Sequence, residues 1–279
     1  MRKIRVKEIE KKVYEATLKA NFSLRKDVLS ALKKALKKET KPLAKNMLKI
    51  LIENAEIAKR QSLAICQDTG MAVVFCEIGE KVCIRGDINN AINNGIKKAY
   101  RDGFLRKSVV NDPFLRRNTN TNTPAIIHYN FIKGGRIKIS VMPKGFGSEN
   151  STFSQMFHPT ASIDRIKEFI IAKTKEVAPS TCPPVILGVG IGGTADKAAL
   201  LAKGALLRPI NKNNPKRHIA KLEKEILEKL NKTNIGPMGT GGESTCLGVN
   251  ILTYPTHIAG LPVCVNVSCH ALRSASVIV

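Results

Sequence analysis

The hydrophobic pattern changes once along the chain, near residue 60, and this change limits the folds that the chain can adopt. Over residues 7–60, apolar side chains recur at the three- and four-residue spacing of amphipathic helices. From Gln61 onward, short apolar runs of strand length alternate with helical stretches. The pattern predicts a mixed α/β fold.

The predicted architecture is a helical N-terminal layer, residues 1–60, packed on a mixed-sheet body, residues 61–279. The strands predicted from apolar runs are 71–75, 126–131, 137–141, 185–189 and 263–267. The helices predicted in the body are 87–102, 164–175 and 197–207, with a surface loop and helix over 211–234. Because no flexible linker or repeat interrupts the 279 residues, we predict a single domain.

Glycine, proline, asparagine and cysteine gather in a few dense loops between these elements. Loops rich in small residues let backbone amides approach a ligand closely. We therefore predict ligand-binding loops, which are Ile65-Cys66-Gln67-Asp68-Thr69-Gly70, Asn118-Thr119-Asn120-Thr121-Asn122-Thr123-Pro124, Lys144-Gly145-Phe146-Gly147-Ser148-Glu149-Asn150, Cys182-Pro183-Pro184, Gly188-Val189-Gly190-Ile191-Gly192-Gly193-Thr194 and Gly236-Pro237-Met238-Gly239-Thr240-Gly241-Gly242.

The charge balance is strongly basic, with 46 Lys and Arg against 22 Asp and Glu and a net charge of +24. Such a surface favours anionic ligands, but a lysine-rich solvated coat explains it equally well. Only 5% of the residues are aromatic and none is Trp, which argues against base-stacking platforms for single-stranded nucleic acid. A basic nucleic-acid-binding protein remains a remote alternative.

The ends of the chain predict a soluble, cytoplasmic protein without membrane insertion. The charged opening Arg2-Lys3-Ile4-Arg5 contains no secretory leader, and no apolar run reaches 18 residues. Residues 233–279 carry only two charged side chains, Glu243 and Arg273. We expect this segment to form core and subunit interface.

Two glycine patterns look like nucleotide motifs but are incomplete. Gly188-x-Gly190-x-x-Gly193 follows a predicted strand, yet the acidic residue that should bind a ribose about 20 residues later is missing. Close packing of a helix on the strand explains these glycines more simply. Gly236-x-x-x-x-Gly241 is followed by Gly242 instead of Lys, so a phosphate loop is rejected.

The seven cysteines divide into two groups by their surroundings. Cys76, Cys83, Cys246 and Cys264 lie in apolar or strand-like runs, where a free thiol is a small hydrophobic side chain. Cys66, Cys182 and Cys269 lie in loops, and the short ligand spacings of a structural zinc site are absent. Thiolates from separate loops could hold an iron–sulfur cluster, although inert thiols are the commoner outcome.

The order of the six loops, from about Cys66 to Arg273, resembles class I (iron–sulfur) fumarate hydratase. The similarity is closer still to the separate alpha subunit of two-subunit fumarase and L-tartrate dehydratase. The resemblance implies that Cys66, Cys182 and Cys269 ligate a 4Fe–4S cluster with one open iron. It implies reversible hydration of fumarate to L-malate, a step of the tricarboxylic acid cycle, with dehydration of tartrate to oxaloacetate as the alternative.

The resemblance also implies the residues that act on the C4 dicarboxylate. Asp68 and His257 would be catalytic, and the substrate would contact Gln67, Asp68, Arg106, Gly147 and His257. An arginine suits this role because it binds a carboxylate through two hydrogen bonds. Without the resemblance, each residue has a simpler explanation as a turn, loop or surface residue. Phe146 departs from the small residue usual in the glycine loop.

The resemblance finally implies that another chain contributes part of the active site. Single-chain relatives continue into a second domain that contributes further substrate-binding groups, whereas this chain ends at Val279. We therefore expect a separate beta subunit, an α2β2 assembly and an isolated chain that is inactive.

Overall fold

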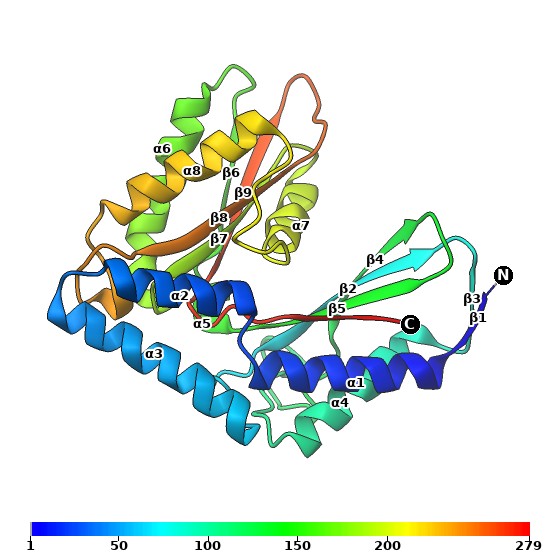
Figure 1. Cartoon of the computed structure of the whole chain (residues 1–279). Coiled ribbons are helices and arrows are strands. Elements are labelled where there is room, and N and C mark those ends of the chain that lie inside the picture. Colours follow the sequence, from blue (N-terminus) through cyan, green and yellow to red (C-terminus); the bar gives the residue numbers. More distant parts are fainter. Residues whose placement is uncertain (1) are drawn as a thin grey trace. The chain divides into compact units, whose positions relative to one another are not determined.

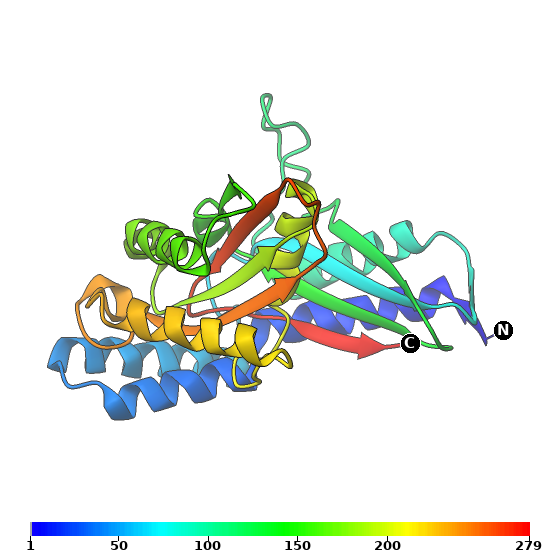
Figure 2. The same ribbon diagram turned by 90° about the horizontal axis from the view of Figure 1, so that it is seen from above.

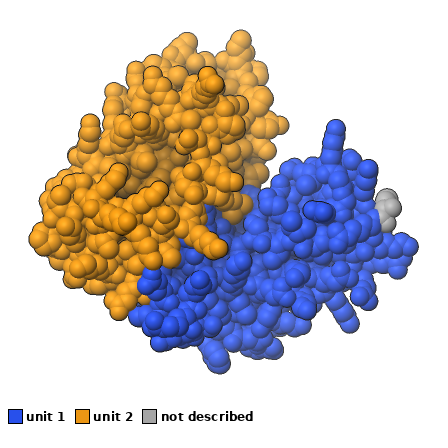
Figure 3. All heavy atoms as spheres, in the orientation of Figure 1, with its two compact units in different colours: residues 1–25, 54–146, 273–279 blue, residues 26–53, 147–272 orange. Residues whose placement is uncertain are grey.

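The computed structural model describes residues 2–279 and divides them into two compact units (Figures 1 and 3). Unit 1 takes residues 2–25, 54–146 and 273–279, and unit 2 takes residues 26–53 and 147–272. Each unit therefore consists of segments that are distant in the sequence. Helix α3 (Pro42–Gln61) begins in unit 2 and ends in unit 1.

Unit 1 is built on a four-stranded sheet in the order β10-β5-β2-β4. Strand β2 runs parallel to β4 and antiparallel to β5, and β10 is antiparallel to β5. A small parallel pair, β1 and β3, forms a second sheet. The elements of unit 1 are β1 (Arg2–Arg5), α1 (Val6–Phe22), β2 (Met71–Gly79), β3 (Val82–Arg85), α4 (Ile88–Asp102), β4 (Ile126–Ile132), β5 (Ile137–Lys144) and β10 (Ala275–Ile278).

The core of unit 1 lies between its sheet and helices α1 and α4. Alternate residues of β2 and β5 point to the same face because side chains alternate along a strand. Helix α1 supplies Ile9 and Val13 and helix α4 supplies Ile92 and Ile96, all with 0% exposure. This packing fixes the start of β2, where the predicted ligand loop 65–70 ends, and the end of β5, where the loop 144–150 begins.

Unit 2 has a second four-stranded sheet in the order β6-β9-β7-β8, with β7 and β8 parallel and β9 antiparallel to both β7 and β6. Helices α6 and α8 pack with the face of β7 that carries Val185, Leu187 and Val189. Elements of unit 2 are α2 (Lys26–Lys38), β6 (Phe153–Phe157), α6 (Ile163–Val177), η1 (Ala178–Thr181), β7 (Val185–Ile191), α7 (Ala195–Ala205), α8 (Arg217–Asn231), η2 (Pro237–Gly239), β8 (Cys246–Thr253) and β9 (Leu261–Ser268). The short helix α5 (Phe146–Glu149) lies at the boundary in the chain.

The glycine fingerprint of β7 is explained by close packing of α7 on the other face of the sheet. A Cβ on Gly188 would collide with the backbone oxygen of Ala202, and one on Gly190 with that of Ala198. Only glycine lets the helix backbone approach the strand this closely. The fingerprint is therefore accounted for by helix packing, as the simpler interpretation predicted.

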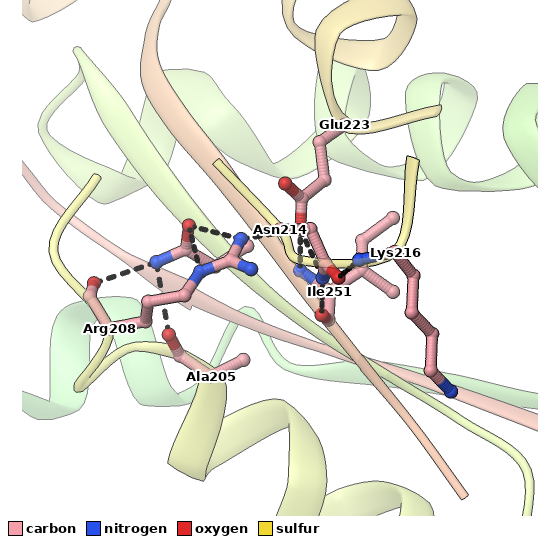
Figure 4. A network of polar contacts seen from close by, with 7 residues as sticks. Ala205, Arg208, Asn214, Lys216, Glu223 and Ile251 are labelled. Carbon is pink, nitrogen blue, oxygen red and sulfur yellow. Dashed lines mark hydrogen bonds and ion pairs between the residues drawn. The ribbon is translucent and has the colours of Figure 1, made fainter. Parts of the chain in front are cut away.

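A buried polar network closes the outer edge of strand β8 (Figure 4). The Arg208 guanidinium donates to Asn250 Oδ1 over 2.7 and 3.1 Å and forms an ion pair with Glu223. The Glu223 carboxylate accepts the Ile251 amide proton at 2.7 Å, and Asn214 donates to the Ile251 carbonyl at 2.8 Å. Side chains thus satisfy edge groups that would otherwise be open to pairing with another strand.

The predicted mixed α/β class is confirmed, and each predicted strand lies within an observed one. The pattern missed strands β1, β3, β6, β8 and β10. The helices predicted for residues 1–60 are divided between the units, with α1 in unit 1 and α2 in unit 2. A single domain over residues 1–279 stays a prediction. No helix among residues 2–279 combines the length and apolar character needed to cross a membrane.

The weakly charged segment 233–279 contributes strands to the cores of both units. Strand β9 is buried along nearly its whole length, and Val263, Val265 and Val267 are each at most 1% exposed. Strand β10 adds Ala275 to the core of unit 1. The predicted subunit interface stays a prediction.

Candidate active site

The Asp68 carboxylate is held by two backbone amides of unit 1. Its Oδ1 accepts the Gly70 N–H at 2.9 Å, and its Oδ2 accepts the Phe146 N–H at 2.7 Å. A Cβ on Gly145 would lie 3.1 Å from Oδ2, so that glycine lets the strand end approach the carboxylate. Each carboxylate oxygen keeps a second lone pair for a proton or a ligand. The arrangement fixes the orientation of the group without using its full hydrogen-bonding capacity.

The loop that carries Asp68 is supported by a buried tyrosine and a buried asparagine. Tyr100 of α4 places its hydroxyl 2.6 Å from the Thr69 carbonyl and 3.0 Å from the Gly70 carbonyl. Asn122 donates from Nδ2 to the Gly70 carbonyl at 3.0 Å. Both supporting side chains have 0% exposure, so the loop rests on a rigid base. Burial is also the main reason that the pKa of Tyr100 is raised to about 12.

Arg273 adds a buried cation to the same loop. Its Nη2 donates to the backbone oxygen of Asp68, and the residue is 4% exposed. The Nε atom is buried without a hydrogen-bond partner. Arg273 was not predicted as a site residue, nor were Tyr100 and Asn122. The one available signal was its position as the only basic residue of segment 233–279.

The backbone of Arg106 lies beside this loop. The Thr69 hydroxyl donates to the Arg106 carbonyl at 2.6 Å, which joins two segments 37 residues apart. The Arg106 side chain is exposed, as is that of Gln67, while Cys66 and Asp68 are half-buried. The structure therefore brings the backbone of Arg106 next to the loop that carries Cys66, Gln67 and Asp68.

Cys182 and the segment that carries Cys269 come together at one end of the central strands of the unit 2 sheet, where β7 begins and β9 ends. The Cys182 carbonyl faces His270, with Nδ1 at 2.9 Å and the backbone N–H at 3.5 Å. Because a carbonyl oxygen only accepts, Nδ1 of His270 carries the proton. The Met238 amide donates to the Pro183 carbonyl at 2.8 Å. Two of the predicted ligand loops, 182–184 and 236–242, thus meet next to the segment that carries Cys269.

His257 lies at the other end of the strands of that sheet. The register pairs Ile186 with Ser268 near the cysteines and Ile191 with Val263 at the other end, about 17 Å away by strand rise. His257 follows β8 at this far end, in the connection to β9. Its Nδ1 accepts the Ala259 N–H at 3.2 Å, so the proton of a neutral ring resides on Nε2. The structure therefore does not group His257 with Cys182 and Cys269.

Gly147 lies in α5 of unit 2, and no atom comes within 4 Å of the position that a Cβ would take. The open side leaves its backbone accessible. Phe146, the departure noted in this loop, is 48% exposed and uses its amide to hold Asp68. The larger side chain therefore leaves the Asp68 contact intact.

The cysteines differ in environment as their sequence contexts predicted, except that Cys83 lies in strand β3 but is only half-buried. Cys76, Cys246 and Cys264 are buried in strands, and burial raises the pKa of Cys76 and Cys246 to about 12 and raises that of Cys264. Cys182 is exposed, and Cys66 and Cys269 are half-buried. Within residues 2–279, the structure gathers no set of three His, Cys, Asp or Glu side chains that could hold a metal ion. The loop thiols fit a cluster by chemistry and accessibility, since thiolates are its ligands.

Comparison with known proteins identifies the class to which this fold and site belong. The sequence pattern of the family described as "Fumarate hydratase (Fumerase)" matches residues 10–278. The chain belongs to this family, and hence to the hydro-lyases, the enzymes that add water to a substrate or remove it.

Relatives cover nearly the whole chain. A protein of Methanocaldococcus jannaschii named "Putative L(+)-tartrate dehydratase subunit alpha" is 42% identical over 270 residues, which is 94% of each chain. The "L(+)-tartrate dehydratase subunit alpha" of Escherichia coli (strain K12) is 28% identical over 256 residues, covering 91% of this chain and 84% of the relative.

Proposed function

We propose that this chain is the alpha subunit of a hydro-lyase that interconverts fumarate and L-malate. The observation that carries the proposal is the Asp68 carboxylate, fixed by the amides of Gly70 and Phe146 on a loop that also carries Cys66 and is bonded to the backbone of Arg106. A general acid or base must be positioned within hydrogen-bonding reach of the reacting group. Asp68 has that rigidity and retains free lone pairs.

Cys66, Cys182 and Cys269 are proposed to hold a 4Fe–4S cluster. When bound, the cluster would supply an open iron that acts as a Lewis acid on the substrate hydroxyl. The accessible loop positions of the three thiols support this choice over the buried strand cysteines. Such thiolates need a reducing compartment, which agrees with a cytoplasmic enzyme.

The chain's own residues would bind and orient the diacid. Arg106 offers a guanidinium that can bind one carboxylate bidentately, and Gln67 offers an amide beside it. The exposed backbone of Gly147 is available as a further donor. Asp68 would transfer the proton at the carbon next to the hydroxyl-bearing carbon, accepting it in dehydration and returning it in hydration.

His257 is proposed to be a catalytic and substrate-binding residue, as the resemblance implies. Its Nε2–H would donate to a substrate carboxylate. Within its own sheet it lies about 17 Å, by strand rise, from the end that carries Cys182 and Cys269.

A separate beta subunit is proposed to complete the active site in an α2β2 assembly. The relatives described above are named as alpha subunits, which supports a second type of chain. Closed two-fold assemblies are the commonest symmetric solution.

A second candidate substrate is L-tartrate, dehydrated to oxaloacetate, and the names of the relatives favour it. Both reactions remove water from a 2-hydroxy diacid. The discriminating group is the substituent on the carbon that loses the proton, which is hydrogen in malate and hydroxyl in tartrate.

The test is anaerobic reconstitution of this chain with iron and sulfide, with and without its beta subunit. The proposal expects a visible cluster spectrum that is lost in Cys66→Ser, Cys182→Ser and Cys269→Ser, with Cys83→Ser as the matched control. Malate-to-fumarate and tartrate-to-oxaloacetate conversion are then measured on the complex. Turnover of tartrate alone would assign the second candidate, and absence of a cluster under every condition would refute the proposal.

A further inference from the structure

A loop of unit 1 extends away from the sheet of that unit and displays large apolar side chains at its tip (Figure 2). Residues 109–118, here called the arm, follow the end of α4 and extend away from the unit 1 sheet (Figure 2). Phe114 is 91% exposed and Leu115 is 72% exposed. Single exposed apolar residues are common, but two adjacent ones on a projecting tip indicate a contact surface.

The arm is held in one conformation by its own hydrogen bonds. Val110 pairs with Asn118, and the Asn111 amide donates to the Arg117 carbonyl at 2.9 Å. At the tip, the Asp112 carboxylate accepts the amide protons of Phe114 and Leu115 at 2.8 and 2.7 Å. A preformed contact element loses little conformational freedom on binding, which favours affinity.

The charges of the arm indicate which kind of partner surface it can bind. Arg116 and Arg117 follow the tip along the chain, and Arg106 and Lys107 precede the arm, all of them exposed. The one acidic side chain of the arm, Asp112, accepts the tip amides. A second copy of this chain, with its net charge of +24, would repel such an arm. The complementary surface is an apolar pocket rimmed by acidic residues on a different chain.

The base of the arm is bonded to the loop that carries Asp68. Asn122 Oδ1 accepts the amide protons of Ser108 at 2.7 Å and Val109 at 3.2 Å, where the arm begins. The Nδ2 atom of the same side chain donates to Gly70. One buried amide therefore joins the root of the arm to the proposed catalytic loop.

We propose that the arm is the docking element for the beta subunit, with Phe114 and Leu115 inserted into an acid-rimmed apolar pocket of that chain. The inference rests on the proposed two-subunit enzyme. Docking would hold the root of the arm, and through Asn122 it would hold the Gly70 end of the Asp68 loop. Assembly and the geometry of Asp68 are then linked by a few hydrogen bonds.

The test measures binding of purified beta subunit by titration calorimetry. The Phe114→Ser/Leu115→Ser variant should bind about thirtyfold or more weakly, the effect of removing an aromatic hot spot. Phe131→Ser is the matched control, because Phe131 is a 77% exposed residue on β4 of the same unit, and its affinity should stay within about threefold of the wild type. Arg116→Glu/Arg117→Glu should bind more weakly and lose part of the salt dependence. Circular dichroism confirms that each variant is folded.

The outcomes separate this inference from the proposed function. If the wild-type pair is active and the tip variant binds as tightly as the wild type, the docking role is wrong and the enzyme proposal stands. If tip variants lose binding while the wild-type complex converts neither diacid, the docking role stands and the substrate proposal falls. If the wild-type chain does not bind the beta subunit at any salt concentration, both fall.

Discussion

Replacing Asn122 by alanine should destabilise the protein by about 4 kcal/mol, because this side chain makes three buried hydrogen bonds in a left-handed conformation. The bonds to Ser108, Val109 and Gly70 span 2.7 to 3.2 Å, and the residue has 0% exposure. At roughly 1 kcal/mol each, they account for about 3 kcal/mol. A positive φ of 58° adds about 1 kcal/mol for alanine.

Asn120→Ala is the matched control for the backbone effect. Asn120 has nearly the same φ, 57°, but its side chain is exposed and makes none of these three bonds. It should therefore lose only about 1 kcal/mol. Urea denaturation followed by circular dichroism measures both free energies of unfolding, and hydrogen exchange of the 66–70 peptide should quicken only in Asn122→Ala. Equal free-energy losses in the two variants would refute the reasoning.

Further expectations concern packing, alkaline stability and the buried arginine. Gly190→Ala should cost several kcal/mol in the free energy of unfolding because its Cβ would collide with α7, whereas Gly260→Ala, with open space around it, should cost under about 1 kcal/mol. The Cys246 thiol has a pKa near 12 in the folded chain against about 8.5 unfolded, so its contribution to stability is full below pH 8.5 and is lost as pH rises toward 12. Cys246→Ala should flatten this alkaline decline in urea midpoints, and an unchanged decline would contradict the assignment. Arg273→Met should speed hydrogen exchange at Thr69 and Gly70 more than Arg273→Lys does, and equal rates would show that the guanidinium does not hold the loop.

Sequence patterning predicted the elements whose apolar period is strong. Strands β2, β5, β7 and β9 are buried and apolar along most of their lengths, and their positions were predicted. Strands β1 and β3 are four residues long, too short for a periodic signal, and their identity as strands depends on pairing with each other. The tertiary pairing, rather than local propensity, decides such elements.

The candidate site was predicted only in part for a related reason. Cys66, Asp68 and Arg106 lie in loops of unusual composition and could be selected from sequence order and family resemblance. Tyr100 and Arg273 act through contacts with residues 30 or more positions away, and an isolated Tyr in a helix gives no sequence signal of such a contact. His257 is close to Cys269 in the sequence, yet it lies at the other end of the strands of the same sheet.

By itself, the sequence determined the α/β class, the loop or strand setting of each cysteine and the family, because period, composition and motif order are local properties of the chain. Only the tertiary structure decided that Asn122 joins the arm to the Asp68 loop, that Phe146 holds the carboxylate, and that Gly188 and Gly190 serve helix packing. These contacts join segments far apart in the chain. They follow from how sheets and helices pack, which no local pattern encodes.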